Sequence, residues 1–309
     1  MLGYALRRVA LAICVAWTVS VLTFALLGLA GDPAIAIAGS SASAEDIALV
    51  RQQYGLDQPL IVQYGIWLLK ALQGDLGQSL MFRTPVSSVI ASRLPVTMLV
   101  GVCAILFALA IAIPLGVMAA TRPNTLLDRT SLTISVVGQA MPSFWFALML
   151  IVVFSVELGW LPASGLDSWW GLILPTVVLG YYAMPAIFRL TRAGMMDVLS
   201  SDFIRTTRAM GLHPASILLA HALRNAILPV VSLAAVQFGY MLNGSIVVES
   251  IFGIKGLGYL GWESISGADI PVVQGVVLVF CCIYVVLALL ADLLNAWLDP
   301  RLRKLQYDQ

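Results

Sequence analysis

The sequence predicts an all-α polytopic membrane protein with six transmembrane helices. Of its 309 residues, 60% are hydrophobic and only 11% are charged, whereas a soluble domain carries roughly 25% charged residues. Six apolar stretches also match the length of about 20 residues that crosses a bilayer as a helix. These stretches are 9–29, 96–119, 132–156, 172–190, 226–248 and 272–293.

The first stretch follows two basic residues, Arg7 and Arg8, and in this respect it resembles a secretory signal. Its apolar run is longer than the roughly 7–15 residues of a cleaved signal core. We therefore expect residues 1–30 to form the N-terminus and a retained first span.

Residues 31–95 predict a small helical insert on the external side, between the first two spans. Ser43 suits the N-cap of a helix whose first turn holds Glu45 and Asp46, because acidic side chains stabilise a helix N-terminus. A second piece, 61–72, repeats aliphatic residues at helical spacing. An insert of about 65 residues has little core of its own, so we expect it to lean on the membrane bundle.

The other five spans lie in a membrane core over residues 96–309, and prolines occur in or at the ends of several of them. Membrane helices tolerate proline where neighbours satisfy the freed carbonyl groups. Kinks would suit a bundle that encloses a pathway, and plain packing explains them equally well. The prolines are Pro114, Pro142, Pro175, Pro185 and Pro229.

Basic residues are distributed unevenly about the predicted spans. Of the 17 Lys and Arg residues, 12 fall on the side that holds both chain ends and 5 fall on the other side. Cytoplasmic loops carry the excess of Lys and Arg. Both termini are therefore predicted to be cytoplasmic, and the external face is predicted to be acidic.

One long polar segment, which we call the elbow (197–225), lies between the fourth and fifth spans on the Arg-rich side. Gly211 suits the left-handed residue that ends a helix. Pro214 suits the first turn of the next helix, where its missing N–H is not needed. We therefore predict two short helices joined by a glycine turn, which is a structure that a partner protein could grip.

The fifth span is the best candidate for the wall of a pathway. At 100° per residue its polar side chains fall within one arc, and its bulky apolar residues fall opposite. Packing between helices by small and amide residues explains the pattern about as well. The tentative pathway residues are Ser232, Gln237, Tyr240 and Asn243, with Glu249 as a rim charge or ion-pair partner and Gln139 and Ser143 beside Pro142.

The sequence does not contain the familiar motifs of a catalytic or cofactor-binding site. It contains no phosphate-binding GxxxxGK[ST], no HExxH and no GxSxG. Residues 256–261 match GxGxxG, but a dinucleotide site needs a surrounding βαβ unit, so we interpret them as an external turn. The four cysteines lie in apolar runs without metal-ligand spacing. We predict no catalytic, cofactor or metal site, and any ATPase must be another polypeptide.

Eight short segments are distributed along nearly the whole chain. They are YALRR at 4–8, GDPA at 31–34, YGLDQP at 54–59, GDLG at 74–77, GWLP at 159–162, RTTRAMGL at 205–212, HALRNA at 221–226 and LDPR at 298–301. Taken together and in order, these segments resemble the membrane subunits of bacterial ABC importers, specifically the dipeptide, oligopeptide, glutathione and nickel permease group.

The resemblance implies a type I ABC importer transmembrane fold, in which the elbow docks into a groove of a cytoplasmic ATPase. Arg205 and Arg208 could equally contact lipid head groups. Lys255 stands where relatives usually have proline, which leaves the external loop's conformation open. The implied coupling residues are Phe203, Arg205, Thr206, Arg208, Ala209, Gly211, Leu212, His213 and Pro214.

The resemblance also implies the partners of the chain. They are a second permease, in a heterodimer, one or two ATPase subunits that bind ATP and Mg, a periplasmic or lipid-anchored binding protein, and the lipid of the bacterial inner membrane, with no nucleic acid. Di- or oligopeptides are the commoner cargo in this group, and glutathione or a nickel or other metal chelate is the alternative.

Two rival functions are a stand-alone secondary carrier and a membrane enzyme. A carrier would need an ion site inside a span, yet only Asp292 lies clearly within one, near its cytoplasmic end. We interpret Asp292 as an interfacial cap or an ion-pair partner. An intramembrane protease would need a paired Ser and His, or two Asp, within the spans.

Overall fold

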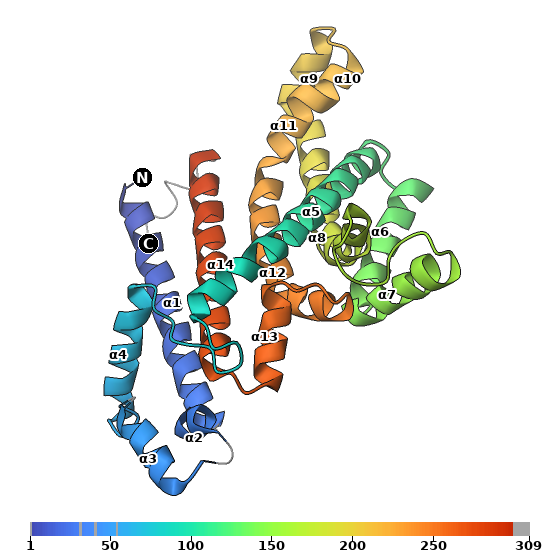
Figure 1. Cartoon of the computed structure of the whole chain (residues 1–309). Coiled ribbons are helices and arrows are strands. Elements are labelled where there is room, and N and C mark those ends of the chain that lie inside the picture. The colour runs from blue at the N-terminus through green and yellow to red at the C-terminus, as the bar shows by residue number, and fades with distance from the viewer. Residues whose placement is uncertain (1, 31–32, 40–41, 54, 299–309) are drawn as a thin grey trace.

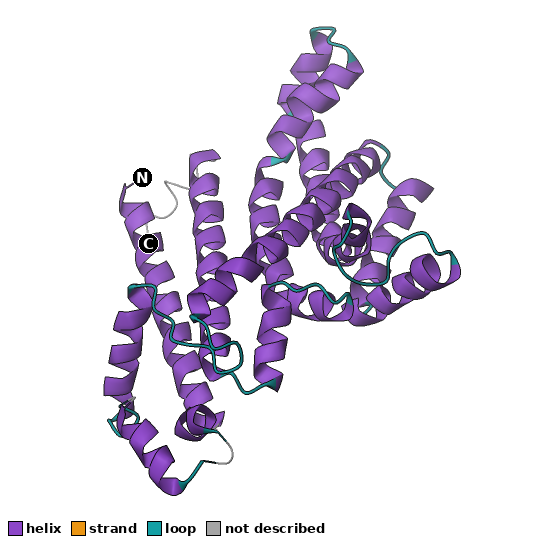
Figure 2. Cartoon of the chain, in the orientation of Figure 1, coloured by secondary structure: helices purple, strands orange, loops and turns teal. Residues whose placement is uncertain are grey.

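The computed structural model describes residues 2–30, 33–39, 42–53 and 55–298. Nearly all of the described secondary structure is helical (Figure 2). Parts of three segments that resemble the importer group lie outside the described residues, namely 31–32, 54 and 299–301.

Five helices of the described chain are long and apolar enough to cross a membrane, and they correspond to five of the six predicted spans. The second begins about ten residues earlier than predicted, at Val86, because the helix continues through Pro95. The five helices are α1 (Leu2–Ala30), α5 (Val86–Thr121), α8 (Ile173–Leu199), α12 (Leu228–Ile251) and α14 (Ile270–Leu298).

The predicted span at 132–156 is not one continuous helix. It is divided between α6 (Leu126–Ala140), α7 (Ser143–Leu150) and a π-helix, η1 (Ile151–Glu157). Pro142 stands at the break in an extended conformation, with φ −61° and ψ 135°. Proline donates no backbone N–H and disfavours a helical conformation in the residue before it, so the helix ends there.

The centre of the bundle is the crossing of α5 over α8 (Figure 1). Glycines bring the two helices close together. A Cβ atom on Gly180 would lie 2.7 Å from the Ala104 carbonyl oxygen, and one on Gly116 would lie 2.8 Å from Thr191 Cβ. Small residues at such crossings let membrane helices pack backbone against backbone. The α5–α8 pair is therefore a tightly packed unit.

The insert contains three helices beside the C-terminal half of α1 (Figure 1): α2 (Pro33–Ala38), α3 (Ala44–Gln53) and α4 (Leu60–Leu72). Ser43 caps α3 as predicted. Its Oγ accepts from the Asp46 N–H at 3.1 Å and donates to Asp46 Oδ2 at 2.7 Å. These bonds to Ser43 hold the pKa of Asp46 below its usual range.

Two further short helices adjoin the long ones. A 3₁₀ turn, η2 (Trp169–Leu172), leads into α8, and α13 (Leu257–Ser266) lies between α12 and α14. Asp269, in the turn after α13, is fully buried. Its Oδ2 accepts hydrogen bonds from Ser79 Oγ at 2.5 Å and the Met81 N–H at 3.1 Å. The turn after α13 therefore holds the loop that precedes α5.

Candidate functional site

The elbow extends beyond the ends of the long helices as a separate projection (Figure 1). It consists of α9 (Asp202–Ala209), α10 (Pro214–Ser216), a π-helix η3 (Ile217–Ala222) and α11 (Leu223–Ala226), the last three running on without a break.

The predicted glycine turn is present in the elbow. Gly211 follows the C-cap of α9 with φ +75°, in the left-handed region that glycine enters without a Cβ clash. Pro214 is the first residue of α10. His213 caps that helix, because its Nδ1 accepts from the Ala215 N–H at 3.3 Å. Local turn chemistry therefore fixes the angle between the two arms of the elbow.

A buried apolar cluster attaches the elbow to the transmembrane helices. Ile204, Ile217 and Ala222 from the elbow pack with Met195 of α8 and Val117 of α5. Ile204, Met195 and Ala222 are fully buried. Because interiors packed this closely transmit displacement, a push on the elbow acts on α5 and α8 together.

The predicted coupling residues form the outer surface of the elbow. All of them are exposed except Leu212, which is half-buried. The Arg205 side chain is 87% exposed and forms an ion pair with Asp202, at 3.8 Å. Phe203 and Met210 add apolar area that is 51% and 72% exposed. Met210 was absent from the predicted set, although its position one residue before Gly211 could have indicated it.

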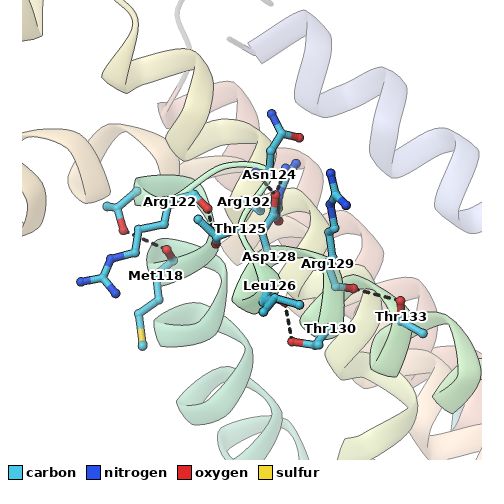
Figure 3. Close-up of polar contacts among 11 residues, drawn as sticks. Met118, Arg122, Asn124, Thr125, Leu126, Asp128, Arg129, Thr130, Thr133 and Arg192 are labelled. Atoms are coloured by element: carbon cyan, nitrogen blue, oxygen red, sulfur yellow. Dashed lines mark hydrogen bonds and ion pairs between the residues drawn. The ribbon is translucent and has the colours of Figure 1, made fainter.

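An ion pair that the sequence did not reveal lies beside the root of the elbow (Figure 3). Arg192 of α8 donates from Nε to Asp128 Oδ1 at 2.6 Å and from Nη2 to Oδ2 at 2.8 Å. The Asn124 N–H donates to Oδ2 at 2.9 Å. The bonds from Arg192 hold the pKa of the buried Asp128 below its usual range.

This ion pair joins α6 to α8, between residues that are 64 positions apart in the chain. Asn124, in the turn between α5 and α6, takes a left-handed conformation, with φ +63°, and its N–H donates to the Asp128 carboxylate. Spacing along the chain could not show the pairing. The position of Asp128 between Arg122 and Arg129 was the only signal.

The proposed pathway face of α12 is divided between exposed and buried positions. Tyr240 and Asn243 are exposed, Gln237 is half-buried and Ser232 is buried. The opposite face of α12 packs inside the bundle. Its buried side chains are Ala234, Phe238, Met241 and Leu242.

Gln139 and Ser143 lie on either side of the break at Pro142. The exposed Gln139 accepts a long hydrogen bond from Arg189 Nη2 through its Oε1, at 3.4 Å. Ser143 is half-buried at the start of α7, which packs against α12.

Glu249 does not have the predicted position at an external rim. It is fully buried, and its Oε1 accepts from Thr97 Oγ1 at 2.7 Å while its Oε2 accepts from the Tyr259 N–H at 2.9 Å. Thr97 Oγ1 in turn accepts from the Leu257 N–H at 2.7 Å. This network, which we call the outer latch (Thr97, Glu249 and the backbone N–H groups of Leu257 and Tyr259), joins α5, α12 and α13.

The glycines of the GxGxxG motif lie at the start of α13, where they pack closely against α12 and the outer latch. Gly256 caps α13, so the motif opens a helix. A Cβ on Gly256 would lie 2.5 Å from Glu249 Oε2, and one on Gly258 would lie 2.8 Å from the Ile246 backbone. Both glycines are thus required by close packing. The adjacent Lys255 is exposed, and its carbonyl oxygen accepts from Arg93 Nη1 at 3.2 Å.

Asp292 near the end of α14 forms an ion pair with Arg8 of α1, at 2.8 Å, which is one of the two predicted roles. Among the described residues, no group of three or more His, Cys, Asp or Glu side chains is placed to hold a metal ion.

Two family models match the chain. The model described as "Binding-protein-dependent transport system inner membrane component" matches residues 112–304, and an N-terminal model of the same kind of membrane component matches residues 1–101.

The chain is also similar, over nearly its full length, to known transport permeases. The chain is 44% identical over 304 residues to the glutathione transport system permease protein GsiC of Escherichia coli O6:H1. The aligned residues cover 98% of this chain and 99% of that protein. GsiC of Salmonella choleraesuis is 43% identical with the same coverage.

A solved structure with the same fold is an inward-facing form of the MetNI methionine ABC transporter. The similarity has a TM-score of 0.58 and 21% sequence identity, and it covers 68% of this chain and 96% of that chain. At this identity the likeness concerns the fold alone.

Proposed function

This chain belongs to the family of binding-protein-dependent transport system inner membrane components, and we propose that it is the permease subunit that forms half of a glutathione import pathway. It is a multi-pass ABC transport component without an ATPase domain of its own, and ATP is bound by partner ATPases.

The observation that carries the substrate is the 44% identity to a glutathione permease over 98% of the chain. The sequence alone favoured di- or oligopeptides as the commoner cargo. Similarity to a glutathione permease favours the alternative instead. Glutathione is itself a short peptide, so a pathway suited to it retains the polar character that was expected for peptides.

The complete transporter in proteoliposomes tests the substrate. With its binding protein, its ATPases and ATP inside the vesicles, we expect uptake of labelled glutathione that unlabelled glutathione abolishes and a tenfold excess of a dipeptide or a nickel chelate does not. Uptake of a labelled dipeptide that glutathione fails to compete would contradict the glutathione assignment while leaving the importer function in place.

The elbow is proposed as the coupling segment to the ATPase. Three features support this role: the exposed Phe203 and Arg205, the fixed turn at Gly211, and the buried cluster that joins the elbow to α5 and α8. A partner that moves this surface also moves the two helices beneath it. In this arrangement ATP binding to the partner would switch the bundle between inward-open and outward-open states.

The exposed stripe of α12 is proposed to face the pathway and a second permease, in a heterodimer. Tyr240, Asn243 and Val247 share one side of the helix and remain exposed in the single chain. Polar groups inside a bilayer are stable only when they face protein or water. A second type I permease subunit across this stripe would satisfy that requirement and complete the pathway.

The proposed orientation places both termini and the elbow in the cytoplasm. The support is the clustering of Arg122, Arg129, Arg192, Arg205 and Arg208 at the elbow end of the bundle. The insert at 31–95 and the outer latch then face the external side, where a periplasmic or lipid-anchored binding protein delivers cargo.

A further inference from the structure

Helix α4 in the insert has an unusual composition for an element outside a membrane. Its 13 residues include a single charged side chain, Lys70. Six aliphatic side chains are between 44% and 86% exposed, namely Leu60, Ile61, Val62, Ile66, Leu69 and Leu72. A helix that is apolar on all sides belongs in a protein core or in a membrane.

The exposed aliphatic residues form one continuous face of α4. At 100° per residue, five of the six fall within an arc of about 140°. The opposite face contacts α1: Tyr64 Oη lies 2.7 Å from Ser20 Oγ, and the rings of Tyr64 and Trp67 lie 5.6 and 5.8 Å from the ring of Phe24. The aliphatic face therefore points away from α1.

The contacts with α1 place α4 at the depth of a membrane-crossing helix. The apolar stretch of α1 runs from Val9 to Leu29 in the sequence, so Phe24 lies about 7.5 Å inside its external end at 1.5 Å per residue. Figure 1 shows α4 beside this external part of α1. The aromatic contact between α4 and α1 thus lies within the outer part of the apolar layer.

The lipid-facing surface of α1 continues onto α4. Of the five long apolar helices, α1 is the least buried, and its Val15 and Leu22 are exposed. Trp67 and Lys70 are residues that favour the membrane interface, because each has an apolar body and a polar tip. An apolar patch of this size in contact with water would be rare in a soluble domain.

We propose that α4 is embedded in the outer leaflet, where acyl chains of the lipids cover the face formed by Ile61, Val62, Ile66, Leu69 and Leu72. The insert would then be anchored in the membrane through α4, and only α2, α3 and the following loops would be fully external. The proposal concerns lipid contact and is independent of which substrate the transporter carries.

Spin-label accessibility in nanodiscs tests the proposal. In the complete transporter, with Cys14, Cys103, Cys281 and Cys282 replaced by Ala, a nitroxide is attached at Leu69→Cys. Matched reference sites are Leu22→Cys on α1, which faces lipid, and Glu45→Cys on α3, which faces water. Collision rates with oxygen, which concentrates in lipid, and with a water-soluble nickel chelate are measured at each site.

We expect the oxygen-to-nickel collision ratio at Leu69 to match that at Leu22 and to exceed that at Glu45 about tenfold. A ratio equal to that at Glu45 would mean water contact and would overturn the proposal. Low collision rates with both probes would mean that a protein surface, such as the second permease, covers the helix, and this result would overturn it as well.

A second measurement avoids the cysteine replacements. Lipids brominated on their acyl chains quench tryptophan fluorescence by contact, and the Leu69→Trp variant places a tryptophan on the aliphatic face of α4. We expect the quenchable fraction to rise in Leu69→Trp relative to the unmodified chain. An unchanged quenchable fraction would show that this face lies away from the acyl chains and would overturn the proposal.

Discussion

The elbow and the outer latch connect the ends of helices to their neighbours in opposite ways. The elbow takes its shape from residues close together in the sequence, Gly211, His213 and Pro214, and its outer surface is exposed. The outer latch depends on Thr97 and Glu249, which are 152 residues apart, and it is buried. Local turn rules therefore determine the first, and only the assembled bundle determines the second.

The largest expected effect is at the outer latch. Glu249→Ala leaves Thr97 and the Tyr259 N–H without their acceptor. Each unpaired buried group costs about 1–3 kcal/mol, so we expect a loss of about 3 kcal/mol of stability, seen as a lower melting temperature in detergent. Glu157→Ala, at an exposed glutamate, is the control and should change little. Equal melting temperatures for both variants would contradict the buried network.

The ion pair beside the elbow comes next and gives a pH test. Because the pKa of Asp128 is lowered in the folded protein, its stabilising contribution is fully present above the unfolded value of about 3.9. It is lost as the pH falls through the lower folded value. Asp128→Asn should reduce stability by about 2 kcal/mol at pH 7, and the difference should shrink towards pH 3.

Thermal melts between pH 7 and pH 3 compare the stability of the wild type with that of Asp128→Asn. Asp197→Asn, at an exposed aspartate of α8, serves as the control for loss of a surface charge. A constant difference between wild type and Asp128→Asn down to pH 3 would count against a stabilising carboxylate at this position.

Gly211→Val tests the glycine turn that sets the shape of the elbow. A side chain at φ +75° costs about 1–2 kcal/mol, and a β-branched residue is especially disfavoured there. We expect normal membrane insertion but loss of the ATPase stimulation by loaded binding protein. Gly74→Val is a matched control, since Gly74 has φ +83° and open space in an external loop. If loaded binding protein still stimulated the ATPase in Gly211→Val, the result would contradict a coupling role of the elbow.

The smallest effect on stability is expected at Arg205. Its ion pair with Asp202 is long and exposed, and exposed pairs contribute little. Arg205→Ala should leave the melting temperature unchanged, yet it should weaken association with the ATPase if the elbow docks there. Pull-down of the ATPase subunits by the tagged chain measures this. Undiminished pull-down would favour the alternative role of Arg205 at lipid head groups.

The sequence predicted features that depend on short stretches of chain. Five of the predicted spans, the Ser43 cap and the Gly211 turn follow from composition and local conformational rules. Pro142 shows the limit of such rules. Pro114 and Pro185 lie inside continuous helices, whereas Pro142 ends one.

Candidate residues whose role depends on distant partners could not be placed in advance. Glu249 was expected at a rim, because nothing near it in the sequence indicates Thr97 or the amide groups of α13. Asp128 and Arg192 are likewise joined only by the fold. The exposed stripe of α12 was foreseen from periodicity, but periodicity could not show that Ser232 is buried.

Helix α5 reaches both regions, with Val117 in the cluster under the elbow and Thr97 in the outer latch. Twenty residues separate them, or about 30 Å along the helix axis. If α5 pivots near Val117, a tilt of only about 5° carries Thr97 sideways by about 2.6 Å over that length. This displacement is comparable to the 2.7 Å hydrogen bond between Thr97 and Glu249, so a slight tilt of α5 that starts under the elbow is large enough to break the outer latch at the other end of the helix.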